Sequence, residues 1–407
     1  MLSKQKKIKP AIAVVGTFDS KAEEHFFLKD RIERRGLQVV TINVGTKGPA
    51  PSPVSVDLYT RLRASGALNP NDRDRAISAM ILEAEVEIQQ FHNSGRISGM
   101  ISAGGGTGTY LCTRIMQVLP LGVPKVMVST VASRDMSETV GTKDITMIHS
   151  VADLLGVNSI SGRILENAAA AVCGMVQTDW TPEAGQKRIA LPFFGFITRS
   201  AQSAKAALRE MGFEVVAFHA NGTGGTAMEE LAEEGYFHGI LDLAAHELAD
   251  QLLDGYCGGI GPQRFEPIAN ESIPRLVVPG GLDCAVLEFT RHNIPPRYAD
   301  RQIFFYDFRS AIRLNLDETR TLADRLADKL NRDAANVRVL IPIEGWSEAD
   351  RRGGPLYAPD ISRAFIDRLK NRLDPGISVN EVEHHINDEA FGRIAADMMV
   401  RMIEGHR

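Results

Sequence analysis

The residues best suited to chemistry form a glycine-rich segment, ISAGGGTGT, at 101–109. A strand-like run precedes it and a helix-like run follows. Free backbone N–H groups and the helix dipole therefore favour an anion there, typically a phosphate. The glycines allow close approach of a ligand to the backbone, and the threonines add hydroxyl groups. These residues are Gly104, Gly105, Gly106, Thr107, Gly108 and Thr109. The alternative interpretation is a tight structural turn between strand and helix.

Two familiar nucleotide-binding motifs do not match this segment. The G-K-[ST] ending of the P-loop is missing. A Rossmann fingerprint would carry a ribose-binding acid about 20 residues further on, but VPKVMVST occupies that window. NAD is therefore disfavoured, and the segment predicts phosphate or carboxylate binding without naming the ligand.

A second polar segment, GTFDSK at 16–21, follows the first strand-like run. Ligands of open α/β sheets bind beyond the carboxyl ends of the strands, which is where this segment is expected. Thr17 can donate a hydrogen bond, Lys21 can pair with phosphate, and Asp19 suits a metal ion or a ribose hydroxyl. The alternative is a helix cap formed by Ser20 or Asp19, which is compatible with binding.

A third segment, at 129–163, is rich in serine, threonine, aspartate and glycine. It also follows a strand-like run, so Thr130 is expected near the same strand ends. Asp144 is a candidate ligand for magnesium or for a hydroxyl group. His149 is more typical of a packed side chain than of a catalyst.

In the second half, PIEGWSEAD at 342–350 and EHHINDEAF at 383–391 place polar residues at predicted strand ends. Acid–base catalysis or metal binding is one interpretation. Its candidate residues are Glu344, His384, His385 and Asp388. The alternative is a helix N-cap formed by Asn387 or Asp388 within a polar turn.

The elements that must position these segments alternate between strand and helix along the whole chain, which indicates an α/β fold. AIAVVG at 11–16 and LQVVTINV at 37–44 predict strands. The helix between them is expected over 21–35, after an S-x-x-E capping box at Ser20 and Glu23. Such a β-α-β unit implies parallel strands joined by a right-handed crossover.

The second half resembles the first. GLQVVTINVGTKG at 36–48 aligns with GFEVVAFHANGTG at 212–224, and SAGGG at 102–106 aligns with VPGGL at 278–282, both at an offset of 176 residues. Two copies of one Rossmann-like unit would explain the shared offset, whereas chance similarity is the alternative. We expect two Rossmann-like subdomains with mostly parallel sheets, at 1–180 and 187–407.

Composition limits the classes of function. The 407 residues carry a net charge of −5, which disfavours a dedicated nucleic-acid binder. The four cysteines show no C-x-x-C pair and no zinc-site spacing, which is typical of reduced, buried thiols. No apolar run is long enough for a membrane span. We expect a cytoplasmic protein that binds neither nucleic acid nor membrane.

In combination, GTFDSK, SAGGGTGT, VGTKDITMIHSVADLLGVNSISGRIL, FHANGTGGTAMEEL and HINDEAF resemble the ATP-binding domain family of the tomato mosaic virus resistance protein. The resemblance covers nearly the whole chain. It implies ATP with Mg²⁺ in the first subdomain, and a homodimer. The implied nucleotide contacts are Gly16, Thr17, Asp19, Lys21, Gly104, Gly105, Gly106, Thr107, Gly108, Thr109, Thr130 and Asp144, with Asp19 and Asp144 as magnesium ligands.

Three functions remain open at this point. The leading hypothesis is an Mg-ATP-binding protein, which would be an ATP-dependent enzyme if it acts on a small metabolite. The second is an enzyme for a hydroxy- or oxo-acid, with its site in a cleft between the subdomains and no nucleotide chemistry. The third is a regulatory or partner-binding protein that uses ATP as a structural ligand. No residue is an unambiguous nucleophile or base, so the sequence leaves enzymatic activity undecided.

Overall fold

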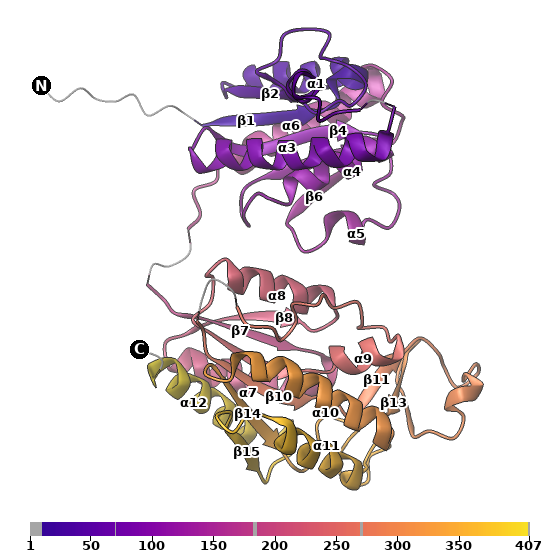
Figure 1. The fold of residues 1–407 in the computed structure, drawn as a ribbon, viewed down its shortest axis with the longest axis vertical. Coiled ribbons are helices and arrows are strands. Elements are labelled where there is room, and N and C mark those ends of the chain that lie inside the picture. Colours follow the sequence, from indigo (N-terminus) through magenta and orange to yellow (C-terminus); the bar gives the residue numbers. More distant parts are fainter. Residues whose placement is uncertain (1–9, 70, 182–184, 269–271, 406–407) are drawn as a thin grey trace, which may run out of the picture. The chain divides into compact units, whose positions relative to one another are not determined.

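The computed structural model describes residues 10–69, 71–181, 185–268 and 272–405. The chain divides into two compact units, Met1–Thr181 (unit 1) and Pro182–Arg407 (unit 2). Each unit is built on its own six-stranded sheet (Figure 1).

Unit 1 has a parallel sheet with helices on both faces. Its strands are β1 (Ala11–Gly16), β2 (Val39–Asn43), β3 (Val56–Asp57), β4 (Ile97–Gly104), β5 (Lys125–Ser129) and β6 (Ile145–His149). Its helices are α1 (Phe18–Glu33), α2 (Leu58–Ser65), α3 (Arg73–Asn93), α4 (Gly106–Met116), α5 (Ser137–Val140) and α6 (Ser159–Val176). The strand order β3-β2-β1-β4-β5-β6 is that of the dinucleotide-binding Rossmann fold.

Alternation along the strands distributes the core of unit 1 between two layers. Ala13 and Val15 of β1 pack with buried residues of α3 and α4, whereas Ile12 and Val14 pack with those of α1 and α6. Successive side chains of a strand point to opposite faces, so a strand covered on both sides is apolar throughout. The run AIAVVG meets this requirement, which is why it forms a central strand.

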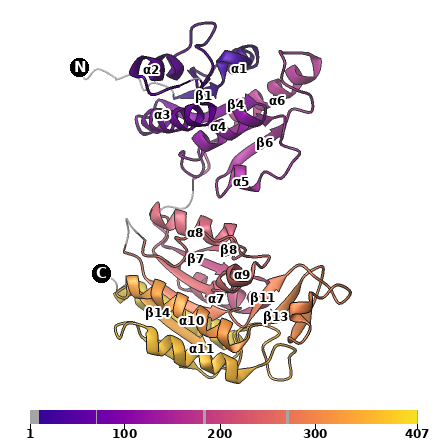
Figure 2. The same ribbon diagram turned by 45° about the vertical axis from the view of Figure 1, so that its right-hand side comes forward.

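Unit 2 contains a second parallel sheet, in the order β15-β14-β10-β9-β7-β8. Its strands are β7 (Arg188–Phe193), β8 (Glu214–His219), β9 (Gly239–Ala244), β10 (Arg275–Gly280), β14 (Val337–Pro342) and β15 (Val379–Val382). The helices are α7 (Thr198–Glu210), α8 (Thr223–Glu233), α9 (Glu247–Leu253), α10 (Leu316–Leu330), α11 (Pro359–Arg372) and α12 (Glu389–Gly405). Helix α7 packs against α12 (Figure 1), and α10 packs against α11 (Figure 2).

Between β10 and α10, the chain forms a small antiparallel sheet in the order β11-β13-β12. Its strands are β11 (Cys284–Leu287), β12 (Ile303–Phe305) and β13 (Ser310–Arg313). This sheet has no counterpart in unit 1 among the described residues.

The predicted α/β fold with two Rossmann-like, parallel-sheet subdomains is confirmed. The 176-residue offset holds for the opening unit, since β1, α1 and β2 correspond to β7, α7 and β8. It also relates the strands that carry SAGGG and VPGGL, β4 and β10, but these two strands hold different positions in their sheets. Strand β4 lies next to β1, whereas β9 separates β10 from β7. The halves therefore share a β-α-β opening, but their strand orders differ.

The first helix starts before its predicted start at 21, but its backbone is non-helical at Lys21, so a short turn precedes the helix that was predicted. Helix α1 begins at Phe18, with Thr17 as its N-cap residue. The Ser20 hydroxyl bonds back to Thr17 and caps no later turn. The backbone N–H of Phe18 is satisfied by Oδ1 of Asn43, at 3.1 Å, so the chain enters the helix directly after β1. Within the described ranges, no helix has the length and apolarity needed to cross a bilayer.

Candidate functional site

The sheet of unit 1 has one point at which its connections change direction. The chain leaves β1 towards β2 on one side and leaves β4 towards β5 on the other, while β1 and β4 pair directly. Ligands of open α/β proteins bind at such a switch point, beyond the carboxyl ends of the strands. The GTFDSK segment starts at the end of β1, and the glycine-rich segment starts at the end of β4. The strand order therefore makes these two predicted segments neighbours.

The glycine-rich segment forms the turn from β4 into α4. Gly105 is the N-cap residue, and no side chain caps the helix. The N–H of Thr109 bonds to the Gly105 carbonyl at 2.8 Å. The N–H groups before Thr109 belong to the open first turn, which has the positive end of the helix dipole. This geometry is suited to an anion.

Two glycines of this turn have different surroundings. A Cβ on Gly104 would lie 3.0 Å from the Gly108 backbone, so this glycine is needed for the turn itself. A Cβ on Gly106 would meet no atom within 4 Å. Space in front of Gly106 is therefore open to a ligand.

Two predicted hydroxyl groups flank the start of α4. Oγ1 of Thr17 lies 4.0 Å from the position that a Cβ on Gly108 would hold. Oγ1 of Thr130 lies 3.7 Å from the corresponding position on Gly105, and the Thr130 N–H bonds to the Gly104 carbonyl at 3.1 Å. The structure thus brings three separate loops of the sequence to one place.

Thr107 and Thr109 have different surroundings. Thr107 is exposed, and its Oγ1 accepts a hydrogen bond from Nη2 of Arg73, at 2.9 Å. Thr109 is buried, and its Oγ1 lies 2.7 Å from Oγ of Ser129 in β5. Thr107 therefore faces the open end of α4, whereas Thr109 fastens α4 to the sheet.

Asp19 and Lys21 already contact other loops of unit 1. Oδ2 of Asp19 accepts a hydrogen bond from the Lys47 N–H at 2.8 Å, and a Cβ on Gly45 would lie 2.4 Å from the Asp19 Cγ. Nζ of Lys21 donates to the carbonyl of Leu154. Both side chains thus help to hold the loops around the switch point.

Glutamates of α1 hold the same loop as Lys21. Oε1 of Glu24 accepts from the Gly156 N–H at 2.9 Å, and Oε1 of Glu23 accepts from the Val157 N–H at 2.8 Å. Glu23 is therefore a link between α1 and the segment after β6, which is why the expected capping box does not form.

The buried His25 side chain packs against the ends of β1 and β4, next to the switch point. Its Nε2 accepts from the Ala103 N–H at 3.4 Å, and its Nδ1 lies 2.6 Å from the Lys21 carbonyl, which it can bond only as a donor. A Cβ on Gly16 would lie 1.8 Å from Nε2, so only glycine fits there. Burial lowers the pKa of His25 to about 4, and the ring is therefore neutral near pH 7.

Asp144 lies apart from the three loops, whereas His149 lies at the same edge of the sheet as they do. Asp144 precedes β6, so it stands at the amino ends of the strands, opposite the switch point. Its carboxylate lies 2.7 Å from Nζ of Lys125 and accepts from the Gly122 N–H at 2.9 Å. His149 ends β6 with an exposed side chain whose Nδ1 lies 3.5 Å from the Ser129 carbonyl.

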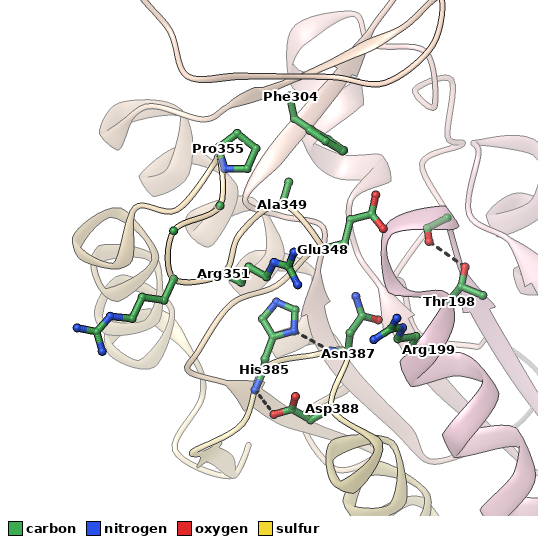
Figure 3. A pocket seen from close by; sticks show the side chains of 14 residues that line it. Thr198, Arg199, Phe304, Glu348, Ala349, Arg351, Pro355, His385, Asn387 and Asp388 are labelled. Atoms are coloured by element: carbon green, nitrogen blue, oxygen red, sulfur yellow. Dashed lines mark hydrogen bonds between the residues drawn. The ribbon is translucent and has the colours of Figure 1, made fainter.

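Unit 2 has a pocket of about 920 Å³ at the carboxyl ends of its own strands (Figure 3). The segments after β7, β14 and β15 line it, together with Phe304 of β12. Three of its side chains are arginines, Arg199, Arg351 and Arg352. Within the described part of the chain, none of the three side chains makes a hydrogen bond or an ion pair. The three guanidinium groups are exposed, and the carboxylates of Glu348 and Asp388 line the same pocket. Guanidinium groups suit a carboxylate or phosphate ligand.

The candidate His385 lines this pocket, but both of its ring nitrogens are occupied. Nδ1 accepts from the Asn387 N–H at 3.1 Å, so Nε2 carries the proton and donates to the Ser347 carbonyl at 3.0 Å. Oδ2 of Asp388 accepts from the His385 N–H at 2.9 Å (Figure 3). His385 and Asp388 therefore shape the pocket wall.

Glu344 and His384 are not among the residues that line the pocket. Glu344 is exposed, and its backbone N–H bonds to the His384 carbonyl at 3.1 Å. Nδ1 of His384 lies 3.6 Å from Oδ2 of Asp388. The predicted set of four polar residues is thus divided between the pocket and the nearby surface.

Sequence reasoning missed the arginines at both sites. Arg73 directly follows Asp72, the N-cap residue of α3, so its position at the carboxyl edge of the sheet was a readable signal. Arg351 and Arg352 lie in the segment after the predicted strand at 337–343, which also places them near the carboxyl edge of a sheet. Arginine is common on surfaces, however, and only the fold shows which of these side chains share a site.

These features define a two-unit α/β protein with a Rossmann-type first sheet and a pocket at the strand carboxyl ends of its second sheet. The chain belongs to the uncharacterised protein family UPF0261. Its N-terminal domain matches residues 10–181, and its C-terminal domain matches residues 186–403.

Relatives of similar length occur in bacteria. A UPF0261 protein of Clostridium tetani is 35% identical over 402 residues, which is 97% of this chain and 99% of the relative. The ToMV resistance protein Tm-1(GCR237) of Solanum lycopersicum is 29% identical over 423 residues, covering 97% of this chain but 56% of the tomato protein. The expected relationship to the tomato protein is thus confirmed, whereas ATP binding stays a prediction.

Solved structures add no functional argument. UGT2 of Phytolacca americana, complexed with UDP-2fluoro-glucose and pterostilbene, aligns over 97% of this chain and 95% of its own. The TM-score is 0.21 and the sequence identity is 11%.

Proposed function

We propose that unit 1 binds Mg-ATP, with the phosphates at the N-terminus of α4. The observation that carries this proposal is the open first turn of α4 at the switch point, where no side chain caps the helix. Backbone N–H groups there suit phosphate oxygens, and the exposed position of Gly106 leaves room for them.

Side chains around this turn supply further donors. The hydroxyls of Thr17 and Thr130 flank it, and Arg73 reaches it through Thr107. Lys21 donates to one carbonyl, but an ammonium group has three donors, so two are available to a phosphate.

The donor set also fits magnesium. Mg²⁺ keeps several water ligands and takes one or two carboxylates together with substrate phosphates. Asp19 supplies a carboxylate in the segment after β1, with one oxygen not bonded to Lys47. Asp144 stands at the opposite edge of the sheet in an ion pair with Lys125, and we therefore leave it out of the proposed site.

The direct test is calorimetric titration of the full-length protein with ATP in the presence and absence of Mg²⁺, with NAD⁺ as the control. The proposal predicts binding of Mg-ATP and none of NAD⁺, and a rise in the unfolding temperature with ATP concentration. No heat signal and no thermal shift at millimolar Mg-ATP would exclude it.

The unpaired arginines favour a second candidate function for unit 2, recognition of a small organic acid in its pocket. His385 has no free ring nitrogen, so this proposal concerns binding rather than acid–base catalysis. A thermal-shift screen of hydroxy- and oxo-acids tests it. Binding that is lost in Arg199→Ala and Arg351→Ala supports it, whereas binding that survives both substitutions contradicts it.

We also propose that the protein forms a homodimer, as its family resemblance implies. Three exposed apolar side chains near the end of β6 offer a surface: Val151, Leu155 and Ile160. Light scattering from the full-length chain measures the oligomeric state, and a monomer at micromolar concentration would contradict the proposal.

A further inference from the structure

Unit 2 contains a buried group of three side chains, His246, Asp250 and Cys257, which we name the His–Asp–Cys cluster. One possible ligand atom from each residue lies within 4.8 Å of the others. Their exposed fractions are 1%, 0% and 5%. Imidazole nitrogen, carboxylate oxygen and thiolate sulfur are the ligands that zinc takes in proteins.

Local structure explains why these residues meet despite an unusual spacing. His246 is the N-cap residue of α9, and Asp250 is four residues further on, so both lie on one side of the helix start. Asp254 ends α9 in a left-handed conformation, with φ of 55°. The following turn returns Cys257 to Asp250, whose Oδ2 accepts the Cys257 N–H at 2.7 Å.

A second observation points to a missing ligand. The His246 ring is fully buried, yet neither Nδ1 nor Nε2 has a hydrogen-bond partner. Leaving a buried polar group without a hydrogen-bond partner destabilises the fold. The ring is nevertheless held firmly, because Phe194 stacks on it with a centroid distance of 3.8 Å, and a Cβ on Gly281 would lie 2.6 Å from the His246 Cβ.

We propose that the His–Asp–Cys cluster binds one divalent transition-metal ion of the zinc class. Each Asp250 oxygen accepts one backbone N–H, from Cys257 and Val286, and retains a lone pair for a metal. Three protein ligands leave a fourth coordination position, which a water molecule would fill.

The position in the fold agrees with a ligand site. His246 follows β9, and β9 pairs with β7 where the connections of the second sheet change direction. A cysteine nucleophile activated by His246 is the competing interpretation. It would need an accessible thiol, whereas Cys257 is buried.

The test uses the full-length protein. Metal content is measured after expression in zinc-supplemented medium, and chelator-treated protein is then titrated with Co²⁺. We expect about one equivalent of zinc per chain, and a sulfur-to-cobalt charge-transfer band in the near ultraviolet. Cys257→Ser should abolish the band, and His246→Ala should abolish stoichiometric binding.

Matched controls separate this site from other thiols. Cys284→Ser changes a buried thiol of the same unit outside the cluster, and Cys173→Ser changes one in unit 1. Both should keep the metal and the band. Wild-type protein without bound zinc and without a cobalt band would overturn the proposal, even if the variants fail to fold. A band that persists in folded Cys257→Ser would overturn it as well.

Discussion

Replacing Gly106 by alanine should separate ligand binding from folding. A Cβ at this position meets no atom within 4 Å, and the residue opens α4. Alanine favours a helix over glycine by up to about 1 kcal/mol, so Gly106→Ala should be as stable as the wild type or slightly more stable. The added methyl group occupies the space in which we place the phosphates. We expect the affinity for Mg-ATP to fall at least about tenfold, or 1.4 kcal/mol.

The matched control is Gly104→Ala, two residues earlier in the same turn. There the Cβ would lie 3.0 Å from the Gly108 backbone, so the turn must shift. We expect a loss of about 1–3 kcal/mol in the free energy of unfolding. Urea unfolding and calorimetric titration measure both variants. If Gly106→Ala folds and binds Mg-ATP with unchanged affinity, the phosphates do not lie at α4 and the reasoning is refuted.

Three further predictions follow from single contacts. Asp144→Asn should leave Mg-ATP affinity unchanged but lower the free energy of unfolding by about 1 kcal/mol, since the exposed Asp144 pairs with the buried Lys125. A changed affinity in calorimetry would show that Asp144 belongs to the ATP site. The pKa of His25 is lowered to about 4. The free energy of unfolding should therefore be highest above pH 6.5, where His25 is neutral in both states, and should fall as the pH drops towards 4. This amounts to about 3 kcal/mol, and urea unfolding at several pH values should show it, with a shallower dependence in His25→Gln. Arg73→Ala should weaken Mg-ATP binding and reduce its salt dependence without destabilising unit 1, and equal affinities at low salt would contradict this.

Much of the fold could be predicted from local patterns. The apolar run at 11–16 and the glycines at the ends of β1 and β4 are local features, and they indicate a parallel α/β unit. The start of α1 could not be predicted, because Asn43, on a different strand, satisfies the N–H of Phe18. The strand order of unit 2 was also inaccessible, since pairing of β7 with β9 depends on contacts between residues far apart in the sequence.

For the candidate sites, too, some features could be predicted from the sequence and others depended on the tertiary structure. The sequence by itself determined that a polar segment follows β1 and a glycine-rich loop follows β4. It also determined that the backbone of the glycine-rich loop suits an anion, because this depends on residue type and on the adjoining helix. Only the tertiary structure decided that these loops meet, that Asp144 lies at the other edge of the sheet, and that Lys21 bonds to Leu154. It also brought His246, Asp250 and Cys257 together, at a spacing that matches no familiar motif. The physical reason is that side-chain chemistry is local, whereas the distance between two side chains depends on strand order and on the turns that return the chain.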